Sequence, residues 1–176
     1  FLRREGHIEH DPAALAVAPK REQKIPAHLS VDEMAQLLDM PDVTGPLGRR
    51  DRAILELFYA SGLRLGELVG LDVEDVNLSA RMVRVMGKGA KERLVPFNGT
   101  TATVLRAWLR DRSQMLAQAP KPQAARSRAQ DDPLFLNARG GRLTGRSVAR
   151  FVSHYVSMCS TRFGIGPHAL RHSFAT

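Results

Sequence analysis

Four side chains, in three stretches of the sequence, are of the types that cleave a phosphodiester. Arg64 lies in SGLRLGEL, Lys88 lies between glycines in GKGAKER, and His168 and Arg171 lie in PHALRHSF. Two arginines and a histidine can neutralise the charge that builds on the non-bridging oxygens of a phosphate under attack. A lysine can protonate the departing sugar oxygen. Together these groups predict phosphate chemistry that needs no metal ion.

Each cluster also has a purely structural interpretation. Arg64 lies between two leucines, and taken by itself it is better explained by a salt bridge to Glu67 or Asp51 than by a bound anion. Lys88 is equally well explained as a solvated charge at a turn. The third cluster can be a helix N-terminus that happens to carry a histidine and an arginine. Their i, i+3 spacing places both on one helical face. The close association of Pro167, His168 and Arg171 makes this cluster the most specific of the three.

Acidic and cysteine residues give little indication of a metal site. Asp72, Glu74 and Asp75 lie between predicted elements and are expected at helix ends and turns, with a divalent-metal cluster as the alternative. Cys159 is the only cysteine, so the chain can form no internal disulfide. Its apolar helical surroundings predict a buried structural thiol. We expect neither a metal ion nor a cofactor.

The composition predicts a basic globular domain. The 176 residues suffice for one domain with a sizeable core, and 26 Lys and Arg outnumber 18 Asp and Glu, for a net charge of +8. Such a charge favours nucleic acid as a partner, and a basic surface that binds nothing explains it equally well. Because we find neither a signal peptide nor an apolar run of membrane-spanning length, we expect a cytoplasmic protein without a membrane partner.

The elements that must position these groups predict a mostly α fold with a small antiparallel β-sheet, an α+β domain. Ser30 and Glu33 form a capping-box pattern at the start of a first helix. A second helix is predicted over residues 50–61 and ends at Gly62, and a short third helix follows from Leu65. The first candidate arginine therefore lies at the junction of two helices.

Alternating residues then predict two strands, over 82–85 and 94–97, joined by the glycine-rich hairpin loop 87–91. This loop would carry Lys88 at an exposed tip. The remaining pattern predicts a long amphipathic helix over 104–115, a mobile loop over 118–132, a short strand at 134–136, a helix over 148–155 and a last helix from His168.

These stretches, in this order, resemble the signature of the tyrosine recombinase or phage integrase family, and in particular its Xer subfamily. Residues 61–71 resemble the first-arginine box, residues 87–96 the catalytic-lysine hairpin, and residues 168–176 the His-x-x-Arg box that opens the next helix. Residues 37–39 and 172–174 lean toward the XerC-like branch. The resemblance covers nearly the whole chain and implies the catalytic-domain fold of that family, truncated at its C-terminus.

The resemblance also implies a role for each candidate residue. Arg64 and Arg171 would bind the scissile phosphate. Lys88 would be the general acid for the 5′-hydroxyl leaving group, and His168 would assist at the phosphate and in proton transfer. Further contacts to DNA are expected from Lys91, Arg93, Arg146 and His172.

Members of this family cut and rejoin double-stranded DNA as tetramers, through a covalent 3′-phosphotyrosine and without metal or nucleotide. The Xer resemblance implies site-specific recombination beside a partner Xer-type recombinase. It further implies activation by a septal DNA translocase and the resolution of chromosome dimers, which serves chromosome partition at cell division.

The resemblance leaves the attacking residue unassigned in this chain. The family's nucleophilic tyrosine would follow Thr176, and the two tyrosines present, Tyr59 and Tyr155, are expected in the core. Residues 1–26 are expected to be an interdomain linker after a missing N-terminal DNA-clamp domain, and residues 27–176 the catalytic domain. The chain by itself should then be inactive. The alternatives are a degenerate recombinase that serves as a non-catalytic DNA-binding module, and an enzyme that relaxes supercoils without synapsis.

Overall fold

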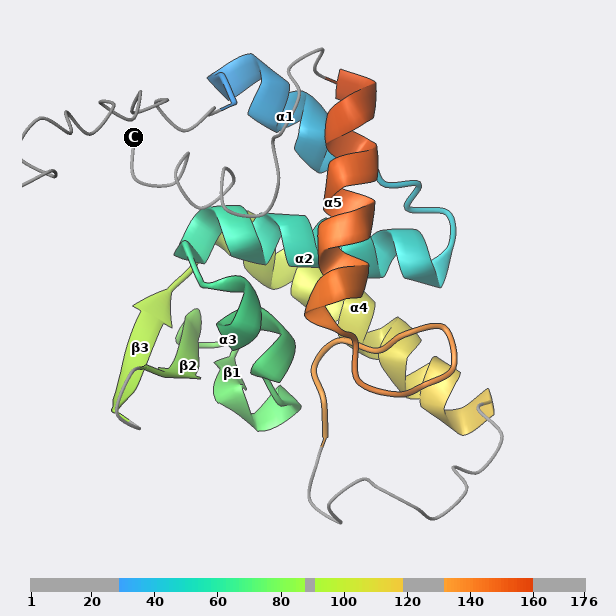
Figure 1. Ribbon diagram of the computed structural model, residues 1–176. Helices are drawn as coiled ribbons and strands as arrows, with labels where there is room; N and C mark the ends of the chain where they lie inside the picture. The colour runs from blue at the N-terminus through green and yellow to red at the C-terminus, as the bar shows by residue number, and fades with distance from the viewer. Residues whose placement is uncertain (1–28, 88–90, 119–131, 160–176) are drawn as a thin grey trace, which may run out of the picture.

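The computed structural model describes residues 29–87, 91–118 and 132–159, and it confirms a mostly α fold with a small antiparallel sheet (Figure 1). Its elements, in chain order, are α1 (Val31–Asp39), α2 (Pro46–Ser61), α3 (Leu65–Gly70), the 3-10 turn η1 (Val73–Asp75), β1 (Val76–Asn77), β2 (Met82–Met86), β3 (Glu92–Pro96), α4 (Gly99–Gln118) and α5 (Gly145–Cys159).

Some of the predictions fall outside this range. The linker over 1–26, nearly all of the loop over 118–132 and the helix from His168 lie outside the described residues. Cys159, at the end of α5, is half-buried rather than fully buried, and it packs against the core. Partial burial raises the pKa of its thiol, as expected for a structural cysteine.

Local caps set the ends of the first two helices as the sequence predicts. The Ser30 hydroxyl accepts from the Glu33 backbone N–H at 3.2 Å, and the Glu33 carboxylate accepts from the Ser30 N–H at 2.8 Å, which confirms the capping box. α2 begins at Pro46, earlier than predicted, because proline is favoured in a first helical turn. It ends at Gly62, whose φ of 57° and ψ of 29° are left-handed values that glycine adopts without strain.

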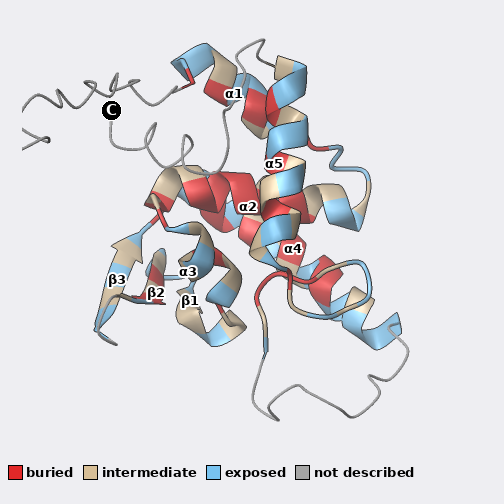
Figure 2. Cartoon of the chain, viewed as in Figure 1, coloured by how far each residue is buried: buried red, intermediate tan, exposed pale blue. Residues whose placement is uncertain are grey.

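α2 is the centre of the hydrophobic core and packs along α4; most of its surface is buried (Figure 2). Ile54, Leu57 and Phe58 of α2 are buried in the same cluster as Leu105 and Trp108 of α4. Burying side chains of this size stabilises the fold by roughly 1.5–3 kcal/mol each. The end of α2 is therefore a firm base from which the chain continues toward α3.

The sheet has the order β1-β2-β3, with both pairs antiparallel. β1 was missed by the sequence reading, because a two-residue strand shows no alternation. In the β2–β3 register Val83 pairs with Val95 and Val85 with Arg93, and both β2 valines are buried. Since paired residues project from the same face of a sheet, Arg93 lies on the face that packs toward the interior.

Residues 132–143, here called the strap, run beside the end of α3 and along α4. The Leu134 N–H donates to the Leu71 carbonyl at 2.9 Å, and the Trp108 indole N–H donates to the Leu134 carbonyl at 2.9 Å. The short strand predicted at 134–136 is thus an irregular segment whose only ladder contacts, among the described residues, are isolated bridges. Its backbone polar groups are satisfied by the end of α3, by side chains of α2 and α4 and by other strap residues instead of by a sheet.

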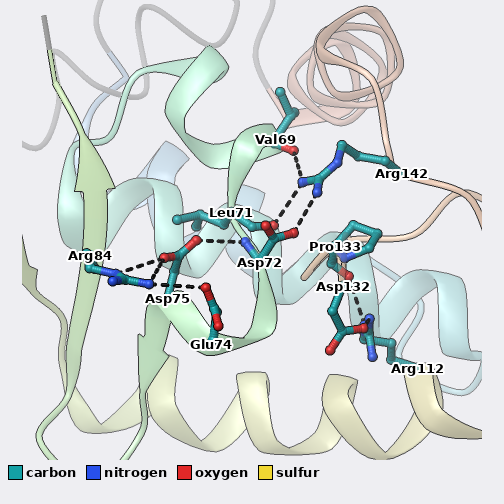
Figure 3. A network of polar contacts seen from close by, with 10 residues as sticks. All are labelled: Val69, Leu71, Asp72, Glu74, Asp75, Arg84, Arg112, Asp132, Pro133 and Arg142. Atoms are coloured by element: carbon teal, nitrogen blue, oxygen red, sulfur yellow. Dashed lines mark hydrogen bonds and ion pairs between the residues drawn. The ribbon is translucent and has the colours of Figure 1, made fainter. Parts of the chain in front are cut away.

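Two arginines fasten the strap to the helices (Figure 3). Arg142 Nη1 donates to the carbonyls of Val69 and Leu71, each at 3.2 Å. Its Nη2 lies 2.5 Å from Asp72 Oδ1. Arg112 of α4 donates through Nε to a strap carbonyl at 2.9 Å. Arg142 therefore supplies donors to carbonyls at the C-terminal end of α3, where helices lack internal partners.

Arg142→Ala should lower the free energy of unfolding of this chain by about 2 kcal/mol, because the carbonyls at the end of α3 and the Asp72 carboxylate lose a charged donor. Urea unfolding followed through the fluorescence of Trp108, the single tryptophan, measures the loss. Arg139→Ala, at an exposed position on the strap, is the matched control and should change stability by less than about 0.5 kcal/mol. If Arg142→Ala lowered the free energy of unfolding as little as Arg139→Ala does, the strap would be held by its backbone hydrogen bonds and not by Arg142.

Candidate active site

The predicted site residues that the structure describes are Arg64, Lys91, Arg93 and Arg146. The other predicted site residues lie outside the described part of the chain, and they are Lys88, His168, Arg171 and His172. The convergence of all the catalytic candidates around one phosphate therefore stays a prediction.

The junction between α2 and α3 exposes Arg64. Leu63 is buried, and Arg64 follows it as the N-cap residue of α3, with an extended backbone at φ −76° and ψ 150°. Leu68 is buried and anchors α3 to the core. The Arg64 side chain keeps 60% of its surface exposed. Within the described residues its Nε and Nη2 have no acceptor, so these N–H groups can bind an anion.

Glu67, in the first turn of α3, holds Arg64 in this position. Its Oε2 accepts from the Arg64 backbone N–H at 2.7 Å, and its Oε1 accepts from Arg64 Nη1 at 3.0 Å. The same two oxygens accept from Arg93 Nη1 and Nη2, each at 2.9 Å. Of the two salt-bridge partners considered for Arg64, Glu67 is therefore confirmed. The alternative salt bridge from Arg64 to Asp51 is wrong, because Asp51 pairs with Arg50 at 2.6 Å.

The Glu67 carboxylate is nearly buried, with 8% of its side-chain surface exposed. Burial tends to raise the pKa of this carboxyl, but the hydrogen bonds from Arg93 and from Arg64 outweigh it and lower the pKa to about 2. Glu67 therefore stays ionised at any physiological pH, and it links α3 to β3 through a charge-assisted contact.

The hairpin of β2 and β3 carries the other described candidates from the lysine stretch. The Gly87 N–H donates to the Lys91 carbonyl at 2.8 Å, which closes the hairpin at the base of the loop over 88–90. Lys91 is exposed at this base. Arg93 is half-buried, and both of its terminal nitrogens contact Glu67. The two basic residues therefore differ, since Lys91 faces solvent while Arg93 is engaged within the protein.

Arg146 lies on the first turn of α5 and is exposed. α5 starts against α3, since a β-carbon at Gly145 would lie 3.5 Å from Leu65 Cδ2. Arg150 and His154 follow Arg146 at four-residue intervals and are exposed as well, so the three form a basic stripe along one face of α5. The sequence reading missed Arg150 and His154, although their i, i+4 spacing was a usable signal.

The two tyrosines of the chain both pack against the hydrophobic core, as expected. The Tyr155 hydroxyl donates to Asp51 Oδ2 at 3.3 Å and so ties α5 to α2. Burial, and next the charge of Asp51, raise the pKa of Tyr155 to about 12. A phenol with this pKa and this contact is poorly prepared to attack a phosphate.

The acidic residues around η1 are confirmed as turn residues. Asp72 precedes η1 and pairs with Arg142, while Glu74 and Asp75 pair with Arg84 at 3.3 and 3.0 Å (Figure 3). Each carboxylate thus has a basic partner. In the part of the chain that the structure describes, no group of three or more His, Cys, Asp or Glu side chains could hold a metal ion.

Glu67→Gln should destabilise the chain in a pH-dependent way. The folded pKa of about 2 lies below the ordinary value of 4.5, so the ionic contact contributes fully above about pH 4.5 and is lost as the pH falls toward 2. The difference in unfolding free energy between wild type and Glu67→Gln should be constant above pH 5 and shrink between pH 4.5 and 2, measured by urea unfolding. The exposed Glu74→Gln is the control, and a Glu67→Gln difference that does not change with pH would contradict the assignment.

Comparisons with known proteins show which family the chain belongs to. The model of the phage integrase family matches residues 27–176. Tyrosine recombinase XerC of Myxococcus xanthus is 49% identical over 176 residues, which are 100% of this chain and 57% of that protein. XerC of Pelobacter propionicus is 44% identical, over 99% of this chain and 54% of that protein. The chain thus spans little more than half the length of these relatives.

Solved structures show the same fold. The crystal structure of XerA recombinase matches with a TM-score of 0.71 and 25% identity, over 87% of this chain and 50% of that one. XerH recombinase, bound to its difH substrate in a pre-cleavage complex, matches with a TM-score of 0.69 and 26% identity, over 90% of this chain and 44% of that one.

Among the described helices none is both long and apolar enough to cross a membrane. The fold of these solved structures agrees with the matches in sequence. On the family model, which covers residues 27–176, the chain belongs to the phage integrase family.

Proposed function

We propose that the full-length protein is a site-specific tyrosine recombinase that cuts and rejoins double-stranded DNA through a 3′-phosphotyrosine. The observation that carries this proposal is Arg64, an exposed guanidinium held by a nearly buried carboxylate in a chain of the phage integrase family. A cation fixed in this way stabilises the charge on a scissile phosphate without having to reorganise during the reaction.

In the proposed reaction a tyrosine oxygen attacks phosphorus while the bond from phosphorus to the 5′-oxygen breaks. Arg64 and Arg171 hold the non-bridging oxygens, and His168 assists them and takes part in removing the proton that the attacking tyrosine hydroxyl gives up. Lys88 gives its proton to the departing 5′-oxygen. No step in this sequence needs a metal ion, and a later attack by a 5′-hydroxyl reverses the chemistry and rejoins the strand.

We assign the attacking tyrosine to a part of the protein beyond these 176 residues. Tyr155 is tied to Asp51 and Tyr59 is packed against the core, so neither is placed to attack DNA. On this proposal residues 1–26 are a linker, residues 27–176 belong to the catalytic domain, and the chain by itself does not cleave.

The basic surface supports DNA as the substrate. Lys91, Arg146 and Arg150 are exposed cations that can contact backbone phosphates. His154, exposed on the same α5 stripe, and His172 are proposed to join them. The likeness to XerC proteins favours a cytoplasmic tetramer with a partner Xer-type recombinase. In such a tetramer the protein would resolve chromosome dimers at cell division, with a septal DNA translocase as its activator.

Arg64→Ala in the full-length protein should slow cleavage by about 100-fold or more, because one fixed donor to the transition state is lost. DNA affinity should fall much less, since other cations still contact the backbone. A suicide substrate that traps the covalent adduct measures cleavage, and a filter-binding titration measures affinity. Arg139→Ala serves as the control. Equal losses in cleavage and affinity would argue against a catalytic role.

The double substitution Arg146→Ala and Arg150→Ala should weaken DNA binding without changing the cleavage rate at saturating DNA. Each lost phosphate contact should reduce the slope of log affinity against log salt by about 0.9. Binding titrations from 50 to 300 mM salt test this expectation, with Arg110→Ala, at an exposed position on α4, as the control. An unchanged slope would place the DNA elsewhere on the protein.

A non-catalytic DNA-binding module is the second candidate, supported by the net charge of +8 and the α5 stripe. The two functions differ in one measurement. The full-length recombinase forms a covalent adduct with a suicide substrate that carries its site, whereas a binding module retains DNA affinity and forms no adduct.

A further inference from the structure

We propose that Arg93 is a positioning residue of the cleavage reaction, which holds the lysine hairpin in register with Arg64 by gripping Glu67. The proposal rests on the function proposed above, since it takes Arg64 and Lys88 as members of one active site. It gives Arg93 a different task from the direct DNA contact that its charge suggests.

The contact between Arg93 and Glu67 is two-armed. Nη1 reaches Oε1 and Nη2 reaches Oε2, each at 2.9 Å, so the planes of guanidinium and carboxylate face each other as two forks. Only 8% of the Glu67 side chain is exposed, against 39% for Arg93. A solvent-exposed ion pair is worth little, but a nearly buried carboxylate needs its partner. This contact is therefore specific in geometry and in charge.

The same carboxylate also holds Arg64. Oε1 accepts from both Arg64 Nη1 and Arg93 Nη1, while Oε2 accepts from the Arg64 backbone N–H and from Arg93 Nη2. Any displacement of Arg93 therefore moves the acceptor of Arg64. The contact to Glu67 uses one N–H of each terminal nitrogen of Arg93, so it fixes the plane and direction of the guanidinium, while three of its five N–H groups remain for other acceptors.

The position of Arg93 in the sheet connects this contact to the hairpin. Arg93 pairs with the buried Val85, so it sits near the loop end of β3 and on the inward face. The loop that contains Lys88 follows Gly87 and leads into Lys91, just before β3. A general acid must be held to about 0.5 Å of its productive position, so the strand that adjoins the Lys88 stretch in sequence must itself be fixed.

The test uses Arg93→Lys in the full-length protein, because lysine keeps the charge but lacks the planar fork. Single-turnover cleavage is measured with two suicide substrates. One has the natural 5′-oxygen at the scissile phosphate, and the other has sulfur there, a leaving group that needs no general acid because thiols are far more acidic than alcohols. DNA affinity and the unfolding midpoint are measured alongside.

Arg93→Lys should slow cleavage of the oxygen substrate at least 10-fold, leave DNA affinity within 2-fold, and cleave the sulfur substrate at nearly the wild-type rate. The ratio of sulfur to oxygen rates does not depend on the fraction of active protein, so partial misfolding cannot imitate this result. Arg84→Lys is the matched control, since Arg84 lies on the neighbouring strand with 40% exposure and pairs with Glu74, Asp75 and, at 3.8 Å, Glu92 instead of Glu67.

Three results would overturn the proposal. The first is wild-type cleavage of the oxygen substrate by Arg93→Lys. The second is a loss of DNA affinity that matches the loss of cleavage, which would make Arg93 a DNA contact. The third is an equal decrease in the cleavage rates of both substrates, which would show that Arg93 does not act through the general acid. Failure of the proposed function looks different, because the wild-type protein itself would then form no adduct with either substrate.

Discussion

The carboxylate of Glu67 is the point on which the described site depends. It caps the first turn of α3 through the Arg64 backbone, accepts from the Arg64 side chain, and accepts both arms of Arg93. Because it is nearly buried, its negative charge must be matched by these donors, and each donor is in turn fixed by the carboxylate. The Glu67 carboxylate therefore fixes the start of α3, the direction of the Arg64 side chain and the position of β3 against α3.

The rest of the fold fixes the position of Glu67 by supporting helix α3 at both ends. α2 supplies the packed core behind the site, and its left-handed end at Gly62 sends the chain into α3. At the other end of α3, Arg142 anchors the backbone to the strap. A second buried polar contact joins α2 to the strap and to α5, since Arg50 contacts Asp51 and the Leu136 carbonyl while Asp51 accepts from Tyr155. Helix α3 is short, so it depends on these supports at both ends.

Features with local signals could be predicted from the sequence. The capping box at Ser30, the stop at Gly62 and the hairpin of β2 and β3 each depend on a few neighbouring residues. The contact of Arg93 with Glu67 could not be predicted, because the two residues are 26 positions apart and meet only after the sheet has docked on α3. The sequence also left two candidates for the salt-bridge partner of Arg64, because that pairing too depends on how the elements pack. Side-chain pairing across elements is a property of tertiary structure and leaves no periodic pattern in the chain.

The location of β3 has a consequence for how copies of the protein meet. Among the strands that the structure describes, β3 is the last in the sheet order, so one side of its backbone pairs with none of them. Open edges recruit strands from other molecules and promote aggregation. Here Lys91 and Glu92 place charges at the start of that edge, and Pro96 ends it with a residue that has no N–H to donate. Charged residues at one end and a proline at the other thus disfavour the addition of a further strand along the strand that carries Arg93.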